Sequence, residues 1–239
     1  MRIAVVSDIH GNLGAFEAVV ADLRQTSPDL VLHGGDLADS GANPVEIVDR
    51  IRDLGWAGVV GNTDEMLSTP EVFETFAAQS PALEALWNAL REMAAWTREV
   101  LGEDRLAWLR RLPRIQHHGS LSLLHASPDH LWCAPMPEAT DDELQTAYES
   151  ITTPTAVYGH VHRPYIRRLP GRSIANSGSV GLPHDGDTRA SYLLLDDSVP
   201  TIRRVAYDLP SELRALSASG LPHADWVGKI LRSATPQMP

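Results

Sequence analysis

Four short polar clusters, each following an apolar run, contain the residues of this sequence best suited to chemistry. They are Asp8-Ile9-His10-Gly11-Asn12, Gly34-Gly35-Asp36, Gly61-Asn62-Thr63-Asp64 and Gly159-His160-Val161-His162. A fifth candidate, His125, ends the apolar run at residues 121–124. Each cluster alone is weak evidence, because Asp-x-His and Gly-Asp pairs are common in ordinary turns. Their occurrence in order, each after an apolar run, indicates one shared site.

The donor atoms of this set suit a pair of divalent metal ions. Carboxylate oxygens, imidazole nitrogens and one amide oxygen come from Asp8, His10, Asp36, Asn62, His125, His160 and His162. This mixture favours Mn²⁺, Fe²⁺, Zn²⁺ or Ni²⁺ over Ca²⁺ or a soft metal. Seven ligands are too many for one tetrahedral ion, but they suffice for two ions that share a carboxylate. Two such ions would clamp a phosphoryl group and convert bridging water to hydroxide near neutral pH.

The elements that must position these residues alternate as β-α-β-α-β over the first sixty residues. Apolar runs at 3–6, 30–32 and 59–60 predict strands, and apolar residues at helical spacing between 16 and 23 predict the first helix. Asn43-Pro44 is typical of a helix start and opens the second helix. Because successive parallel strands end at the same edge of a sheet, the first three clusters should meet there.

The rest of the chain predicts further helices and short strands. Residues 70–111 have a helical pattern, and helices are also expected at 141–149 and 224–232. Short strands are expected at 114–116, 121–124, 156–158, 165–168, 174–175, 192–195 and 202–205. A parallel opening followed by hairpins predicts mixed sheets with helices outside. No linker divides the chain, so we expect one domain over residues 1–239 with a helical insert at about 66–112.

The ordered motifs resemble those of the calcineurin-like metallophosphoesterases, most closely their compact bacterial and archaeal phosphodiesterase branch. That branch also has a segment like Asn176-Ser177-Gly178-Ser179-Val180-Gly181-Leu182-Pro183. The similarity runs from Arg2 to about Tyr207. It implies an α/β fold of four layers, an α/β/β/α sandwich with two mixed sheets. It also implies a metal-dependent phosphodiesterase that uses a metal-bridging hydroxide for in-line attack on phosphorus.

The resemblance implies a role for each ligand in a centre of two divalent ions. Asp8, His10 and His162 would hold the first ion, Asn62, His125 and His160 the second, and Asp36 would bridge both. Mn²⁺ is the expected metal, with Fe, Zn, Ni or Co as alternatives. Asn62 and Asp64 are the expected catalytic residues, Asp64 by orienting a residue or water on the side of the leaving group.

Substrate contacts are expected from Thr63, Asn12 and Arg163. Many members of the family have histidine where this chain has Thr63, and that histidine can assist the leaving group. A hydroxyl is a very poor proton donor near neutral pH, so general-acid catalysis by Thr63 is not expected.

The remaining histidines and the single cysteine are expected to have structural or surface roles. We expect His33 to pack inside the second strand, His117 and His118 to lie in a hairpin turn, and Cys133 to be half-buried. His130, His184 and His223 are expected in solvated loops.

Composition limits the partners of the protein. The chain has 239 residues, a hydrophobic fraction of 43% and a formal net charge of −11, which disfavour disorder, general nucleic-acid binding and anionic membranes. No apolar stretch approaches the roughly 18 residues of a membrane span, and the apolar run at the N-terminus is too short for a signal peptide. We therefore expect a cytoplasmic protein that acts on a small phosphoester or nucleotide, with a homo-oligomer left open.

Two other kinds of function remain open at this point. One is hydrolysis of a dinucleoside polyphosphate or a phosphomonoester, including phosphoprotein. The other is a metal-loaded phosphate or nucleotide sensor without turnover, which the full ligand set disfavours.

Overall fold

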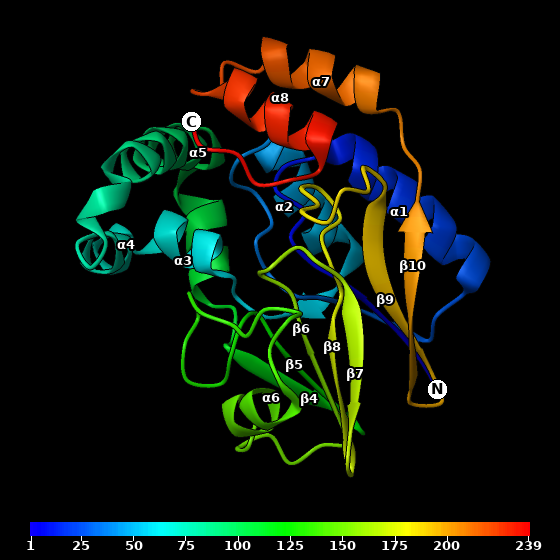
Figure 1. Cartoon of the computed structure of the whole chain (residues 1–239). Helices are drawn as coiled ribbons and strands as arrows, with labels where there is room; N and C mark the ends of the chain where they lie inside the picture. The colour runs from blue at the N-terminus through cyan, green and yellow to red at the C-terminus, as the bar shows by residue number, and fades with distance from the viewer.

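Two mixed five-stranded sheets pack face to face, with helices on their outer faces (Figure 1), in the computed structural model, which describes residues 1–239. The first sheet has the order β10-β9-β1-β2-β3, with β1 (Arg2–Val6), β2 (Leu30–His33), β3 (Ala57–Gly58), β9 (Ala190–Asp196) and β10 (Val199–Val205). The second has the order β4-β5-β6-β8-β7, with β4 (Ile115–His118), β5 (Leu121–Leu124), β6 (Thr155–Tyr158), β7 (Tyr165–Leu169) and β8 (Arg172–Asn176). The predicted four-layer α/β/β/α architecture is confirmed.

The helices cover both sheets. α1 (Leu13–Thr26) packs against β9, β10 and α7 (Leu209–Ala218), and α7 packs against α8 (Ala224–Ser233). α2 (Pro44–Leu54) contacts α1 and α5, while the short α6 (Asp141–Ala147) lies against the second sheet (Figure 1). Between the sheets in sequence come α3 (Asn62–Ser68), α4 (Pro70–Ala77), the 3₁₀ turn η1 (Pro81–Leu83) and α5 (Glu84–Arg110). The helical pattern predicted for residues 70–111 is confirmed; its description as an insert stays a prediction.

Strand β1 shows how the layers are specified by side-chain alternation. Ile3 and Val5 point into the core between the sheets, where they meet Leu121 and Leu123 of β5. Ala4 and Val6 point to the other face and pack in the cluster that includes Phe16 of α1. Because both faces of the strand are buried from Ile3 to Val6, these four residues are all apolar rather than alternating.

Several sequence expectations differ from the structure. The third strand is Ala57–Gly58 rather than 59–60: the Val60 N–H donates to the Pro113 carbonyl, so the chain has left the sheet by that residue. Helix α7 was not expected, although Asp208 accepts a hydrogen bond from the Ser211 N–H at 3.0 Å, as a helix-capping aspartate does. The side chain of Cys133 is exposed rather than half-buried.

His117 and His118 end strand β4 instead of lying in the hairpin turn. They pair with Ser122 and Leu121 of β5, and the His117 ring nitrogen Nδ1 lies 2.7 Å from the Ser122 hydroxyl. None of the helices has the length and apolar character needed to cross a bilayer.

Candidate metal centre

The seven predicted ligands converge because each follows a strand that ends at the same end of the molecule. Asp8 and His10 follow β1, and Asp36 follows β2. Asn62 is the first residue of α3, directly after β3 and its short connection. On the second sheet, His125 follows β5, and the pair His160 and His162 follows β6. The two sheets thus contribute to one site from opposite sides.

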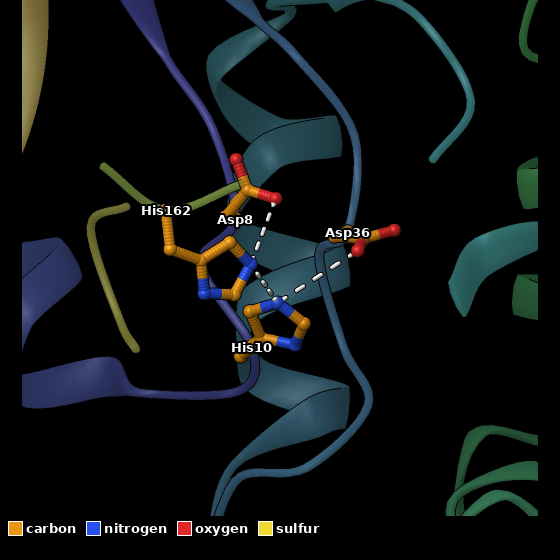
Figure 2. A group of neighbouring side chains, drawn as sticks. All are labelled: Asp8, His10, Asp36 and His162. Atoms are coloured by element: carbon orange, nitrogen blue, oxygen red, sulfur yellow. Dashed lines mark hydrogen bonds and ion pairs between the residues drawn. The ribbon is translucent and has the colours of Figure 1, made fainter. Parts of the chain in front are cut away.

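Four of these residues form a compact group. One ligand atom each from Asp8, His10, Asp36 and His162 lies within 4.8 Å of all the others. Figure 2 shows the two imidazole rings turned toward each other, with their Nε2 atoms 3.2 Å apart. The His162 Nε2 atom lies 3.2 Å from Asp8 Oδ1, and the His10 Nε2 atom lies 3.8 Å from Asp36 Oδ2. All four residues are buried.

The other three residues gather around one oxygen atom. Asn62 Oδ1 lies 2.8 Å from both His125 Nε2 and His160 Nδ1. Asp36 Oδ2 lies 3.5 Å from His125 Nε2, so this carboxylate stands between the two groups.

Backbone carbonyls orient three of the four imidazoles. The Nδ1 atom of His10 lies 2.9 Å from the Asp39 carbonyl, that of His162 lies 2.5 Å from the Leu182 carbonyl, and that of His125 lies 2.8 Å from the Gly34 carbonyl. A carbonyl can only accept, so each ring carries its proton on Nδ1 when neutral and presents a lone pair on Nε2. Two such lone pairs, on His10 and His162, then face each other at 3.2 Å. Two neutral rings repel in this arrangement, and either a proton or a metal ion between the nitrogens would relieve the repulsion. The arrangement therefore fits a metal site.

The charges of the site also fit a cation. Asp8 and Asp36 are buried, and their only ion-pair partners are histidines, with no Lys or Arg. Burial alone would raise the pKa of both carboxyl groups, but the neighbouring histidines outweigh it and hold both pKa values below the ordinary value. Burial opposes protonation of His125, yet the charge of Asp36 raises the pKa of this imidazole to about 9. The carboxylate of Asp36 therefore stabilises positive charge beside it.

The backbone of the ligand loops is held in a conformation that residues other than glycine rarely adopt. Five of the seven predicted ligands have positive φ: Asp8 (55°), His10 (49°), Asp36 (53°), His160 (65°) and His162 (54°). Each such residue is strained, and it persists only where the surroundings determine its conformation. Such strain clusters at functional sites.

Glycines let the loops approach one another. A Cβ atom on Gly61 would lie 2.0 Å from Asp36 Oδ1, and one on Gly159 would lie 2.3 Å from Asp8 Oδ2. Neither distance is tolerable, so both positions need glycine for close approach.

Asp64 holds two ligand loops together. Its carboxylate accepts hydrogen bonds from the backbone N–H groups of Asp36 (2.8 Å), Leu37 (3.0 Å) and Gly61 (2.9 Å). Burial, together with the charge of Asp36, raises its pKa to about 7. Asp64 is fully buried, so these contacts give it a positioning role; its predicted action near the leaving group stays a prediction.

The three predicted substrate contacts lie in different surroundings. Thr63 lines a cavity of about 330 Å³ beside the ligands, and its buried hydroxyl has no hydrogen-bond partner. Arg163 lines a neighbouring cavity with His160 and forms an ion pair with Glu138. Asn12 is buried, where it caps α1 through Ala15 N–H (2.9 Å) and donates to the Gly181 carbonyl (3.0 Å). These bonds tie strand ends together, and contact of Asn12 with a substrate stays a prediction.

Two residues of the site were missed by sequence reasoning. His184, expected in a solvated loop, stacks on His162 with ring centroids 4.4 Å apart, and its Nε2 atom is buried without a partner. The sequence cue for His184 was its place directly after the segment 176–183, which the family resemblance includes. Asp39 accepts a hydrogen bond from Thr97 of α5 (3.1 Å), while its carbonyl holds His10. Nothing in its local sequence indicates that role. His33 is buried inside β2, as expected.

Comparison with known proteins identifies the family. The family model of the calcineurin-like phosphoesterase superfamily domain matches residues 1–198, and the chain belongs to this superfamily. The protein MJ0912 of Methanocaldococcus jannaschii is 31% identical to this chain over 252 residues, covering 96% of each.

Solved structures agree. A metallophosphoesterase from Sphaerobacter thermophilus is 27% identical, with a TM-score of 0.80 over 98% of this chain and 100% of that chain. The protein PH1004 from Pyrococcus horikoshii OT3 has a TM-score of 0.84 over 99% of both chains and is 18% identical, a likeness that shows the fold alone. The resemblance inferred from the motifs is confirmed.

Proposed function

We propose that this calcineurin-like phosphoesterase hydrolyses phosphodiesters with two divalent transition-metal ions, of which Mn²⁺ is the preferred one. The observation that carries the proposal is the position of Asp36. Its Oδ2 atom lies 3.8 Å from His10 Nε2 in one ligand group and 3.5 Å from His125 Nε2 in the other. A carboxylate shared by two groups of nitrogen and oxygen donors is the arrangement expected of a bridging ligand.

The residues present fit such a centre. Asp8, His10 and His162 would hold one ion, Asn62, His125 and His160 the other, and Asp36 both. When bound, two such ions polarise a phosphoryl group and make a hydroxide nucleophile available near neutral pH. The protein's own contribution is to fix the donors: backbone carbonyls orient three imidazoles, and Asp64 holds the Asp36 loop against Gly61.

Substrate contacts by Thr63 and Arg163 are part of the proposal, and the cavities that these residues line support it. The Thr63 hydroxyl, which has no partner in the protein, can donate a hydrogen bond to a phosphate oxygen. Arg163, next to His160 in the neighbouring cavity, can contact a second anionic or polar group of the substrate if it exchanges Glu138 for it. A small phosphoester or nucleotide as substrate and a cytoplasmic location are parts of the same proposal.

The test is metal-dependent turnover of bis-p-nitrophenyl phosphate. We expect no activity after exhaustive chelation, restoration best by Mn²⁺, and two equivalents of metal per chain by elemental analysis. A parallel assay with p-nitrophenyl phosphate distinguishes diesterase from monoesterase activity. Full turnover by demetallated protein would overturn the metal mechanism, and faster hydrolysis of the monoester would overturn the assignment as a phosphodiesterase.

A further inference from the structure

The cavity beside the metal ligands has one polar side and one apolar side. His10, Asp36, Asn62, Thr63, His160 and His162 line the polar side of this space of about 330 Å³. The facing side is made by six apolar residues of two helices, here called the α5–α8 wall: Leu86, Leu90, Met93, Trp226, Val227 and Ile230. A group bonded to a phosphate held at the ligands can therefore reach apolar side chains.

Each helix presents one face to this cavity. Leu86, Leu90 and Met93 are spaced i, i+4 and i+7 along α5, and the three wall residues of α8 occupy neighbouring positions on one side of that helix. Figure 1 shows the chain after α8 running to α5, and its residues Pro236–Met238 also line the cavity. The remaining lining residues are Ser40, Leu182 and His184.

The wall offers few polar groups to a ligand. The one side-chain donor among its six residues is the Trp226 indole N–H, which is already bonded to the Gln237 carbonyl at 2.9 Å. The edge of a nucleobase that is buried against these six residues would lose hydrogen bonds to water without replacing them there, which is costly. Apolar surface buried there is stabilised instead.

We propose that the substrate of this centre is a phosphoester that carries a compact alkyl or aryl group, and that the α5–α8 wall binds this group. The inference rests on the proposed function, since it places the phosphate at the metal ligands. A volume of about 330 Å³ is at the lower end of the range for small-molecule sites, which suits a compact group beside the phosphate.

Alkylphosphonates test the proposal directly. They have one organic arm, cannot be hydrolysed at the P–C bond by this chemistry, and leave the metal-binding head constant. On the Mn²⁺-loaded protein, we would measure the inhibition constants of methyl-, butyl- and hexylphosphonate against bis-p-nitrophenyl phosphate. Each added methylene should lower the inhibition constant about three- to fivefold until the cavity is filled. Adenosine 5′-phosphate should inhibit more weakly than hexylphosphonate.

A matched pair of variants locates the effect. Leu90→Asn places an amide in the wall, whereas Leu83→Asn makes the same change at an exposed residue of η1, outside the cavity lining. The dependence of the inhibition constant on alkyl chain length should weaken in Leu90→Asn and persist in Leu83→Asn. The inhibition constant of methylphosphonate should be unchanged in both. Circular dichroism and metal content verify that both variants fold and bind metal.

The outcomes separate the two proposals. If methylphosphonate inhibits but longer chains bind no better, the apolar group is not bound at the wall and this inference fails, while the proposed function stands. The inference also fails if adenosine 5′-phosphate inhibits more strongly than hexylphosphonate. If the holoprotein neither turns over the diester nor binds methylphosphonate, the proposed function fails and the inference fails with it. The wild-type chain-length series decides the question even if Leu90→Asn does not fold.

Discussion

The ligand loops and the α5–α8 wall border the same cavity, but they are held in place by opposite means. The loops are held by hydrogen bonds, such as those from Asp36 N–H and Gly61 N–H to Asp64, in a backbone conformation that gives five ligands positive φ. The wall is held by side-chain packing: Met93, Trp226 and Val227 belong to one apolar cluster. Hydrogen bonding and strain specify positions closely, whereas packing tolerates changes of similar volume.

This difference indicates which substitutions should affect metal binding and which should affect the choice of substrate. A change in the loops moves a ligand atom, so it should affect metal binding and every substrate alike. A change in the wall alters only the shape and polarity met by the group attached to phosphorus, so it should affect some substrates more than others. Chemistry and selectivity are thereby placed on separate elements.

The largest effect should come from removing the shared carboxylate with Asp36→Asn. Loss of a partner outside the metal ligands typically costs about 10–100-fold in activity or metal affinity, and loss of a bridging ligand should cost more. We expect loss of at least one metal equivalent by elemental analysis and a rate reduced by more than a hundredfold. Asp104→Asn, which changes an exposed carboxylate paired with Arg52, is the control. Equal metal content in the two variants would reject the bridging role.

A methyl group between the loops should have the next largest effect. In Gly61→Ala the new Cβ would lie 2.0 Å from Asp36 Oδ1 and 2.3 Å from Asp36 N, so the Asp36 loop must move. We expect weaker metal binding and activity lower by about 10–100-fold on all diesters, as for loss of an outer partner. Gly228→Ala lies inside α8, where the nearest atom is the flexible Arg232 guanidinium at 3.3 Å, and should keep both properties. A substrate-selective loss in Gly61→Ala would contradict the division between loops and wall.

The same division explains what could be predicted from the sequence. Asp8, Asp36 and Asn62 could be assigned to one site because each follows a strand, and the parallel order of β1, β2 and β3 places strand ends together. His125 and His160 follow strands of the second sheet, so the parallel-strand argument did not reach them. They were included because they too follow apolar runs, and the family resemblance then divided the ligands between the two ions. The alternation of strands and helices predicted mixed sheets with helices outside, and the family resemblance implied the four layers.

The wall could not be predicted, because its residues have no distinctive chemistry. Leu86 and Leu90 lie on an amphipathic helix, and such a pattern is the same whether the apolar face meets a core or a cavity. Trp226 is ambiguous for the same reason. His184 was misjudged because its environment depends on stacking with His162, which lies on another loop far away in the sequence. Its place after the segment 176–183 pointed toward the site but did not show this contact.

A smaller and selective effect is expected at Thr63, where the ligand loops meet the cavity. Its hydroxyl cannot protonate a leaving oxygen near neutral pH, so charge should accumulate on that oxygen and rates should depend steeply on leaving-group pKa. Thr63→His should flatten this dependence and accelerate the poorest leaving groups by about tenfold or more. Rates for a series of substituted phenyl phosphodiesters measure the slope, and Thr63→Ser should retain the steep one. A shallow slope in the parent would mean that another residue supplies the proton.

The smallest effect on activity is expected from His33, which lies on β2 only three residues before Asp36 but takes no part in the site. Its ring is fully buried without a hydrogen-bond partner, and burial lowers its pKa to about 3. In the unfolded chain the imidazole of His33 has the ordinary pKa of 6.5. Between pH 6.5 and about 3, the unfolded state therefore binds a proton on His33 that the folded state does not bind. Above pH 6.5 this difference does not affect the free energy of unfolding. Below pH 6.5 it lowers the free energy of unfolding by about 1.4 kcal/mol for each unit of pH.

His33→Leu removes this proton and two unpartnered nitrogens, so the variant should gain stability relative to the parent as the pH is lowered from 8 to 5. Urea denaturation of both proteins after treatment with a chelator, at several pH values, measures the difference between their free energies of unfolding. The contributions of the other titrating groups cancel in this difference. Metal content and turnover at pH 8 should equal those of the parent, since no ligand contacts this ring. A difference in stability that does not change with pH would show that His33 keeps its proton in the folded state. A loss of metal would show that the positions of the metal ligands depend on packing inside β2 as well as on the loops that follow the strands.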